Sequence, residues 1–321
     1  MLLASLAILI GLPVLIWSAE RFIHGAAFVA NHYGISPLFI GMFIIGFGTS
    51  APEIIVSVFA ALQGNGGLAL GNAFGSNITN ITLVVGITAL LSPIVVKSDI
   101  VKKELPILLA VTFFVVWILF DLELSHDDAF SLLGIFILLI SWSIWQTIKT
   151  PNDELGNNTA GKDIGTPSQL KSHLIWLVLG LTVLIVSSRV LVWGAVEVAQ
   201  YFQVSDVIIG LTIIGIGTSL PELIASIIAV RKNEHELAIG NIVGSNLFNT
   251  LAVVGIAGII QPVELSPAFF YRDILLMLGV TVALLIFCLG IRKPGKVSRI
   301  EGAALVICFI GYNTFLISSQ F

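Results

Sequence analysis

One internal duplication, at an offset of 169 residues, constrains the fold of this chain more than any other feature. The segment Gly46-Phe-Gly-Thr-Ser-Ala-Pro-Glu53 returns as Gly215-Ile-Gly-Thr-Ser-Leu-Pro-Glu222. At the same offset, Gly71-Asn-Ala-Phe-Gly-Ser-Asn-Ile-Thr-Asn80 returns as Gly240-Asn-Ile-Val-Gly-Ser-Asn-Leu-Phe-Asn249. Each first segment places a glutamate beside glycine and proline in an apolar stretch. Paired polar segments that break helices indicate the central site of a membrane transporter.

Composition places the whole chain in a bilayer. With 57% hydrophobic residues, 11% charged residues and a mean hydropathy of +1.04, the chain is too apolar for a soluble protein of 321 residues. Most apolar stretches approach or exceed the roughly 20 residues that a helix needs to cross the hydrocarbon core. We therefore predict an all-α polytopic membrane protein with ten transmembrane helices. The predicted spans are Leu2–Ala19, Ile35–Leu62, Leu68–Val96, Leu105–Phe120, Phe130–Ile148, Leu174–Val196, Val207–Val230, Leu237–Val263, Ile274–Ile291 and Gly302–Phe321.

The basic residues predict the orientation. Twelve of the fifteen lysines and arginines fall on one set of alternating loops, and such loops are cytoplasmic under the positive-inside rule. Ten spans then place both termini outside the cell membrane, which is the inner or plasma membrane. The first span lacks a basic segment before it, which favours an uncleaved membrane helix over a secretory signal.

The duplication also predicts the symmetry. Each half contains five spans, and because five is odd, the second half must enter the membrane from the opposite face. We predict two inverted five-helix repeats, residues 1–148 and 174–321. A segment rich in Asn, Gly, Asp, Thr and Ser, residues 149–173, is typical of a flexible cytoplasmic linker.

Within the predicted spans, the ionisable residues are Glu53, Arg189 and Glu222. A charge at the bilayer centre costs about 2.5 kcal/mol or more, so each residue needs a reason. Two interpretations of the glutamates stay open: a cation site, or protonated acids hydrogen-bonded between helices. Arg189 aligns with Glu20, but inverted symmetry puts the two near opposite faces, so we interpret Arg189 as a snorkelling interfacial residue.

The duplicated segments are rich in oxygen ligands that suit hard cations such as Ca²⁺ and Na⁺. Hydroxyl residues precede each glutamate by about one turn, and each proline removes a helical hydrogen bond, which frees a carbonyl near Gly48 or Gly217. Serine and asparagine four residues apart in the second segments share a helix face. Asn77 and Asn246 point elsewhere, and we expect them chiefly to hold helix packing. The candidate metal ligands are Thr49, Ser50, Glu53, Ser76, Asn80, Thr218, Ser219, Glu222, Ser245 and Asn249.

Taken together, the duplicated motifs in a ten-helix chain resemble the two α-repeats of the sodium/calcium exchanger family, within the calcium/cation antiporter superfamily, and the length is similar to that of prokaryotic members. The resemblance implies that Glu53, Glu222, Thr49 and Thr218 bind calcium. It implies sodium sites that use Ser50, Ser219, Ser76, Ser245 and the carbonyls of Gly46 and Gly215, with Asn80 and Asn249 completing the centre. Some relatives, including the potassium-dependent branch, carry aspartate at the position of Asn249, so its neutral amide favours potassium-independent exchange.

The expected function is electrogenic exchange of Na⁺ for Ca²⁺ by alternating access, with the first and sixth helices sliding across the motif helices. A Ca²⁺/H⁺ antiporter is the nearest alternative, because the two glutamates could release protons when metal binds. A passive cation channel is less favoured, and no pairing of nucleophile and base near the motifs indicates an enzyme. We expect no cofactor; the partners are Ca²⁺, Na⁺ and the lipid bilayer, with no nucleic acid and no protein partner readable from the sequence.

Overall fold

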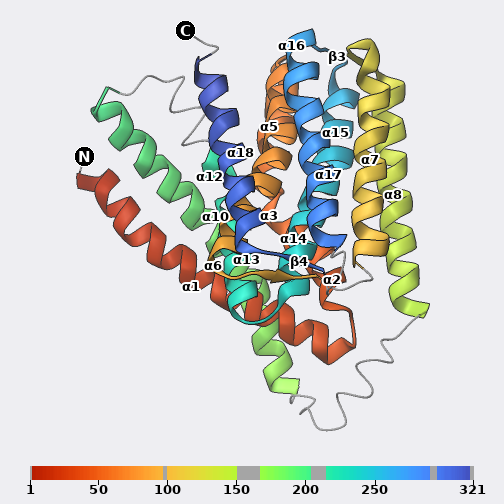
Figure 1. The fold of residues 1–321 in the computed structure, drawn as a ribbon. Helices are drawn as coiled ribbons and strands as arrows, with labels where there is room; N and C mark the ends of the chain where they lie inside the picture. The colour runs from red at the N-terminus through yellow and green to blue at the C-terminus, as the bar shows by residue number, and fades with distance from the viewer. Residues whose placement is uncertain (1, 97–99, 150–166, 204–214, 290–294, 319–321) are drawn as a thin grey trace.

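The computed structural model describes residues 2–96, 100–149, 167–203, 215–289 and 295–318, which form an all-helical bundle (Figure 1). Eight helices in these ranges are long and apolar enough to cross a membrane, and a bent helix pair makes a ninth span. The expected span Val207–Val230 falls partly on residues 204–214, which lie outside the described ranges. The prediction of a polytopic helical membrane protein is confirmed, and the count of ten stays a prediction.

The first half of the chain contains helices interrupted by wider π-helical turns and two short strands. In chain order its elements are α1 (Leu2–Tyr33), α2 (Pro37–Ile40), η1 (Gly41–Gly46), α3 (Phe47–Thr49), α4 (Ala51–Leu62), α5 (Gly66–Thr79), η2 (Asn80–Val85), α6 (Gly86–Leu91), β1 (Ile94–Val95), η3 (Ile100–Glu104), α7 (Leu105–Ile118), η4 (Leu119–Asp121), β2 (Glu123–Leu124) and α8 (His126–Lys149).

The second half follows the same order of elements in the residues described. They are α10 (Pro167–Tyr201), α12 (Gly215–Thr218), α13 (Leu220–Arg231), α14 (His235–Phe248), η6 (Asn249–Val253), α15 (Val254–Ile260), β3 (Val263–Glu264), α16 (Pro267–Phe269), η7 (Phe270–Ile274), α17 (Leu275–Leu289), β4 (Lys296–Val297) and α18 (Arg299–Ser318).

Two predicted boundaries are wrong. The first helix runs on past Ala19 to Tyr33, because Glu20, Arg21 and His24 end the apolar stretch without breaking the helix. It ends at Gly34, whose φ of +63° is a conformation that glycine adopts without strain. The predicted linker is also too long at its end: residues 167–173 belong to α10, while 150–166 lie outside the described ranges.

Helices α1 and α10 lie side by side and antiparallel along one edge of the molecule (Figure 1). Glycines on both helices allow backbone contact along their length. A Cβ added at Gly25 would lie 2.8 Å from the His173 carbonyl oxygen, and one at Gly180 would lie 2.8 Å from the Phe22 nitrogen. Small residues at such crossings let membrane helices approach closely. The contacts make α1 and α10 a tightly packed pair.

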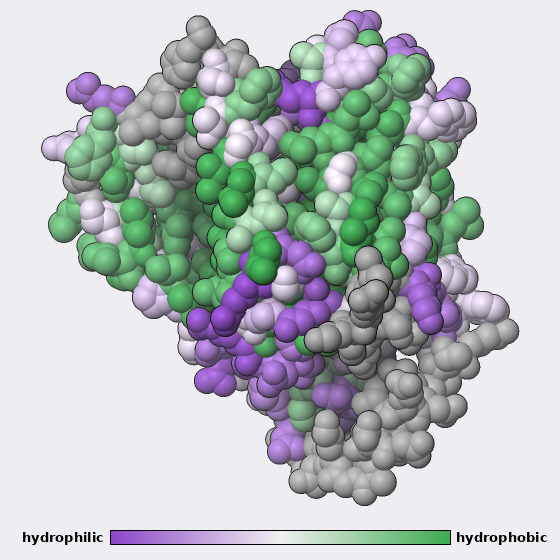
Figure 2. All heavy atoms as spheres, in the orientation of Figure 1, coloured by the Kyte–Doolittle hydropathy of each residue, from purple (hydrophilic) through white to green (hydrophobic). Residues whose placement is uncertain are grey.

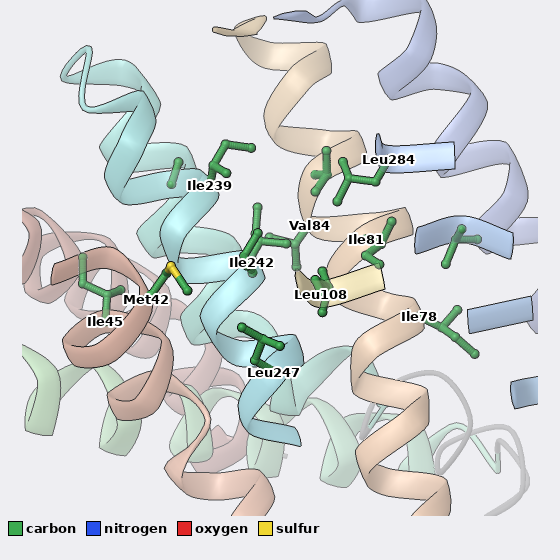
Figure 3. Packing of buried hydrophobic residues seen from close by; sticks show 14 of the residues in the cluster. Met42, Ile45, Ile78, Ile81, Val84, Leu108, Ile239, Ile242, Leu247 and Leu284 are labelled. Atoms are coloured by element: carbon green, nitrogen blue, oxygen red, sulfur yellow. The ribbon is translucent and has the colours of Figure 1, made fainter. Parts of the chain in front are cut away.

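The centre of the bundle is formed by η1, α14, α5 and η2 (Figure 3). Here again glycine brings backbones together: a Cβ at Gly240 would lie 2.7 Å from the Leu38 carbonyl, and one at Gly244 would overlap the Met42 carbonyl. Around this crossing, Figure 3 shows the Met42 side chain lying toward Ile242 on α14. The motif segments of the two halves are therefore packed directly against each other.

Short strands tie the halves together crosswise. Strand β1 pairs antiparallel with β4, so that Ile94 lies opposite Val297, and β2 pairs antiparallel with β3, so that Leu124 lies opposite Val263. Strands β1 and β3 occupy equivalent positions in the two halves, at the offset of 169 residues. Each of them pairs with a strand from the other half. Figure 1 places β3 and β4 far apart along the long axis of the bundle.

The outer surface fits a bilayer. Figure 2 shows a broad hydrophobic surface over the bundle, with hydrophilic residues gathered toward its two ends. Long apolar side chains such as Leu9, Leu138 and Ile307 are about 70% exposed, at 69%, 70% and 68%. Apolar area of this extent is stable against lipid and not against water.

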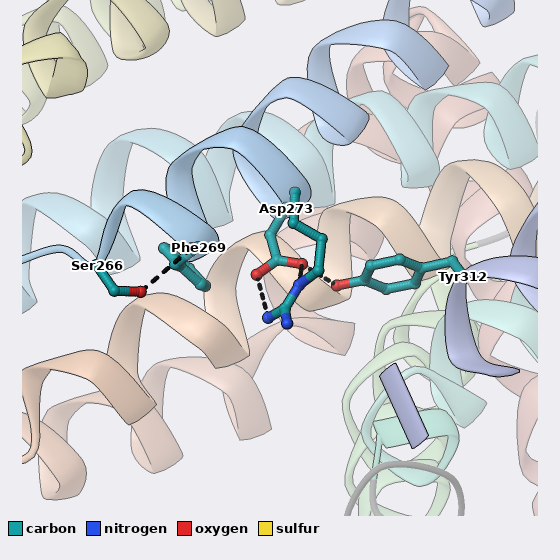
Figure 4. Close-up of polar contacts among 5 residues, drawn as sticks. Ser266, Phe269, Asp273 and Tyr312 are labelled. Atoms are coloured by element: carbon teal, nitrogen blue, oxygen red, sulfur yellow. Dashed lines mark hydrogen bonds and ion pairs between the residues drawn. The ribbon is translucent and has the colours of Figure 1, made fainter. Parts of the chain in front are cut away.

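One polar cluster lies apart from the duplicated motifs, between η7 and α18 (Figure 4). Arg272 forms a salt bridge to its neighbour Asp273 at 2.7 Å, and the Tyr312 hydroxyl donates to Asp273 Oδ1 at 2.7 Å. The equivalent residues of the first half, Lys103 and Glu104, also form an ion pair, at 3.5 Å. Adjacent opposite charges keep these carboxylates paired inside the helix bundle.

Candidate cation site

Each first motif breaks its helix at an equivalent serine. Ser50, with φ −83° and ψ 3°, separates α3 from α4, and Ser219, with φ −88° and ψ 7°, separates α12 from α13. The break after α3 bends the span by 46°. Proline follows each serine by two residues and occupies the first turn of the next helix, where its missing N–H costs nothing. Sequence correctly predicted both breaks.

The two glutamates lie in the first turns of α4 and α13 and are buried, each 1% exposed. They interact electrostatically across the boundary between the halves. Ser50 of the first half donates its hydroxyl to Glu222 Oε1 of the second at 3.2 Å. Helix N-termini favour negative charge, so both carboxylates sit at positions that stabilise them. The structure thus brings Glu53, Glu222 and Ser50 together.

Helices α5 and α14 bring the second motifs to the same centre. Ser76, Asn80, Ser245 and Asn249 are all buried. The Ser245 hydroxyl donates to the Gly46 carbonyl at 3.2 Å, which joins the second motif of one half to the first motif of the other. Two of the π-helical segments, η2 and η6, begin at the equivalent asparagines. Wide turns of this kind are frequent at functional sites, and sequence patterns do not predict them.

Several buried oxygens of this centre lack hydrogen-bond donors in the described part of the chain. A buried acceptor without a partner costs about 1–3 kcal/mol, so such a cluster calls for a positive ligand. Cations bound by six to eight oxygens suit this donor set. The acceptors are Glu53 Oε2, Glu222 Oε2, Asn77 Oδ1, Asn80 Oδ1, Ser219 Oγ and Asn249 Oδ1.

The remaining motif asparagines hold the packing, as expected. Asn77 Nδ2 donates to Thr250 Oγ1 at 2.7 Å, and Asn246 Nδ2 donates to the Asn77 carbonyl at 3.5 Å. Asn246 Oδ1 in turn accepts from Asn80 Nδ2 at 3.1 Å. Because Asn80 Nδ2 donates to Asn246, the Asn80 Oδ1 oxygen is left as an acceptor.

Sequence reasoning missed two asparagines that brace the glutamate turns. Asn241 Nδ2 donates to the Glu222 carbonyl at 3.2 Å and to Ser226 Oγ at 2.9 Å. Its counterpart Asn72 Nδ2 donates to the Glu53 carbonyl at 3.1 Å and to Ser57 Oγ at 2.9 Å. The offset of 169 residues relates all of these residues pairwise, and that register was the signal that could have found them.

Two of the candidate hydroxyls differ in their surroundings. Thr49 Oγ1 lies 3.1 Å from Asn241 Oδ1 and 3.0 Å from the Ile45 carbonyl, so it is held between its own helix and α14. Thr218, at the end of α12, is partly buried. Gly215 is the first residue described in its segment, and it opens α12.

The carbonyls that proline was expected to free have donors nearby. The Gly48 carbonyl faces the Ser50 N–H, and the Gly217 carbonyl accepts the Ser188 hydroxyl at 3.2 Å. The Gly46 carbonyl also accepts bonds, from the Ser50 N–H at 3.1 Å, the Ser245 hydroxyl at 3.2 Å and the Thr49 hydroxyl at 3.4 Å.

Arg189 has a partner that the sequence did not predict. Its Nη2 donates to the Pro52 carbonyl at 3.4 Å, one residue before Glu53. The exposed side chain therefore reaches the first motif of the other half, and its snorkelling stays a prediction. Glu20, the residue at the equivalent position, has its carbonyl in contact with Lys232 Nζ at 3.3 Å, so the two residues do not share a partner.

Fold and site together define a polytopic membrane protein with a buried, acidic, oxygen-lined centre at the junction of two homologous halves, which is the architecture of a cation transporter. A sequence model described as "Sodium/calcium exchanger protein" matches residues 3–145 and 172–318. The chain belongs to the sodium/calcium exchanger family, as its motifs predicted.

Individual proteins similar to this chain are named as antiporters or as sodium/calcium exchangers. The chain is 46% identical over 319 residues to a protein of Alkalimonas amylolytica named as the antiporter CaxA, with 99% of this chain and 100% of that protein covered. It is 28% identical over 355 residues to the sodium/calcium exchanger MaX1 of Methanosarcina acetivorans, with 97% of each covered. A solved structure of the sodium-calcium exchanger NCX_Mj matches with a TM-score of 0.82 and 28% identity, over 97% of this chain and 98% of that one.

Proposed function

We propose that this protein exchanges Na⁺ for Ca²⁺ across the cell membrane by alternating access. The observation that carries the proposal is the pair of buried glutamates, Glu53 and Glu222, each with a carboxylate oxygen that has no hydrogen-bond donor among the described residues. MaX1 and NCX_Mj are both named as sodium/calcium exchangers, which favours sodium as the coupling ion.

The proposed ligands are the residues that the motifs supply in duplicate. Carboxylates and threonines hold Ca²⁺, while serines and backbone carbonyls hold Na⁺, and the asparagine amides complete both shells. Hydrogen bonds between Ser50 and Glu222 and between Ser245 and Gly46 support a single shared centre. The set is Gly46, Thr49, Ser50, Glu53, Ser76, Asn80, Gly215, Thr218, Ser219, Glu222, Ser245 and Asn249.

In this proposal, the net charge of the ion site couples Na⁺ movement to Ca²⁺ movement. Two ionised glutamates give the centre a charge of −2, which one Ca²⁺ neutralises and three Na⁺ carry to +1. Exchange of three sodium ions for one calcium ion then moves net charge across the membrane. An uncompensated pair of carboxylates at the membrane centre is costly, so the ion-free carrier changes conformation rarely and exchange is obligatory. The neutral amide of Asn249 makes potassium unnecessary.

We further propose that the ten spans form two inverted repeats, residues 1–148 and 174–321, with both termini outside. The crosswise pairing of β1 with β4 and β2 with β3 supports this symmetry. The close packing of α1 on α10 supports a sliding pair that opens the centre to each side in turn.

Uptake of ⁴⁵Ca²⁺ into proteoliposomes tests the proposal. Vesicles are loaded with Na⁺, K⁺ or choline at clamped pH, and the wild type is compared with Glu53→Gln and Glu222→Gln. We expect uptake only with internal Na⁺, stimulated by an inside-positive potential, and at least tenfold lower in either variant because each loses a charged ligand. Wild-type exchange in both variants would refute the site.

A calcium/proton antiporter is the second candidate, and the buried carboxylates are the observation that favours it, because they could carry protons in one half of the cycle. Uptake that is independent of Na⁺ but driven by a pH gradient would support this function. A conductance without counter-transport would instead indicate a passive channel.

A further inference from the structure

Helix α10 touches both glutamate motifs with two adjacent residues. Ser188 donates its hydroxyl to the Gly217 carbonyl at 3.2 Å, in the first motif of the second half. Arg189 donates from Nη2 to the Pro52 carbonyl at 3.4 Å, in the first motif of the first half. Arg189 therefore lies at the depth of the carboxylates and beside the first turn of α4.

An arginine at this depth is costly unless something compensates its charge. The guanidinium stays protonated in proteins, and a charge facing hydrocarbon at mid-membrane costs several kcal/mol. Its partner here is a neutral carbonyl, and the negative group with which it interacts electrostatically is Glu53. The Arg189 side chain is also exposed, and an exposed guanidinium within a span costs less against a water-filled cavity than against lipid.

The arginine breaks the symmetry of the duplication. The equivalent position in α1 is Glu20, whose carbonyl contacts Lys232 just beyond the end of α13. Of the two related outer helices, only α10 brings a cation to a motif carboxylate in the described residues. A residue retained merely for packing would not need a charge at this position.

We propose that Arg189 is a tethered cation of the transport site, which lowers the affinity of the Glu53 side for free cations and weakens Ca²⁺ more than Na⁺. This inference rests on the proposed ligand set and adds a residue outside both motifs that tunes selectivity between the two ions. Because Arg189 belongs to the outer helix pair, its distance from Glu53 changes when that pair slides.

The electrostatic role has a signature that packing does not. Repulsion between the guanidinium and a bound ion scales with the charge of the ion, so the factor for Ca²⁺ is the square of the factor for Na⁺. Removing the charge tightens binding of both ions, whereas a loosened structure weakens both.

Equilibrium binding to the purified full-length protein tests the proposal. ⁴⁵Ca²⁺ affinity is measured in choline buffer, and Na⁺ affinity is measured by competition, for wild type, Arg189→Gln and Arg189→Lys. We expect Arg189→Gln to bind Ca²⁺ about tenfold and Na⁺ about threefold more tightly, and Arg189→Lys to stay near wild type. The matched control is Lys232→Gln, which removes a cation from another backbone carbonyl outside the centre and should leave both affinities unchanged.

Three outcomes would overturn the proposal. One is Arg189→Gln affinities within twofold of wild type for both ions, and another is equal weakening of both ions. The third is a Glu53→Gln variant that binds Ca²⁺ as tightly as wild type, which would show that Glu53 is not part of the site. Binding needs no coupling ion, so a result in which protons and not sodium drive uptake would refute the proposed exchange without touching this test.

Discussion

The helices that carry the second motifs and the two long outer helices differ sharply in their surroundings. In their most apolar stretches, 78% of residues are buried in the span Gly66–Leu91 and 89% in His235–Ile260. The corresponding shares are 28% for α1 and 22% for α10. Both pairs are duplicated, so duplication alone does not decide what a helix does.

In the proposed exchange mechanism, this difference would separate a fixed part, the motif helices, from a mobile part, α1 and α10. The motif helices are held on all sides by glycine-mediated backbone contacts and by amide bonds between the halves. The outer helices pack chiefly against each other, with α13 and the short segments as further neighbours. A pair with few contacts to the bundle can shift along it while the oxygen-lined centre stays intact.

The largest effect is expected from cross-links, which test whether α1 and α10 move as a pair relative to the motif helices. In a variant without Cys288 and Cys308, Gly11→Cys with Leu191→Cys joins α1 to α10, where a Cβ at Gly11 lies 3.3 Å from the Leu191 Cβ, near disulfide range. Exchange should survive. Glu20→Cys with Lys232→Cys, joined by a short reversible thiol linker, fastens the pair to α13, and ⁴⁵Ca²⁺ exchange should fall more than tenfold until reduction restores it. Equal effects of both links would contradict a sliding pair.

A smaller effect is expected from the asparagine braces. Asn241→Ala and Asn72→Ala each remove bonds to a glutamate carbonyl and a serine hydroxyl, and leave buried groups without partners. At about 1–3 kcal/mol per orphaned group, we expect Ca²⁺ affinity to fall about tenfold in equilibrium binding. The control is Asn313→Ala, because among the described residues Asn313 bonds within α18, to the Phe309 carbonyl. Braces and control with the same affinity would place the asparagines outside the fixed part.

The smallest effect on transport is expected at the peripheral polar cluster. Tyr312→Phe removes one hydrogen bond to the buried Asp273, which keeps its salt bridge to Arg272. We expect a loss of about 1–3 kcal/mol in stability, seen as earlier thermal unfolding in detergent, and Ca²⁺ affinity within twofold of wild type. A large change in affinity with unchanged unfolding would show that this cluster belongs to the transport machinery.

Much of the centre was readable from the sequence. The broken helices at Ser50 and Ser219, the burial of both glutamates and the approach of the second motifs all follow from local rules. Proline and glycine punctuate a helix wherever they occur, and a carboxylate inside an apolar span must be sheltered by other parts of the protein.

Other features required the folded chain. Hydropathy marked the end of the apolar stretch at Ala19, but the helix continues to Tyr33, since charged side chains do not oppose helical hydrogen bonds. The partners of Asn241, the donor to the Gly217 carbonyl and the direction of Arg189 depend on neighbours far away in the sequence.

Composition, the duplication and the two acidic, broken-helix motifs were enough to predict a duplicated membrane protein and its family. Which oxygens have partners, where the π-helical turns fall and which outer helix brings a cation to the centre depend on how the chain packs. The reason is physical: apolarity, proline and glycine act through the local backbone, whereas the pairing of a buried polar group depends on which distant donor the packing places within about 3 Å.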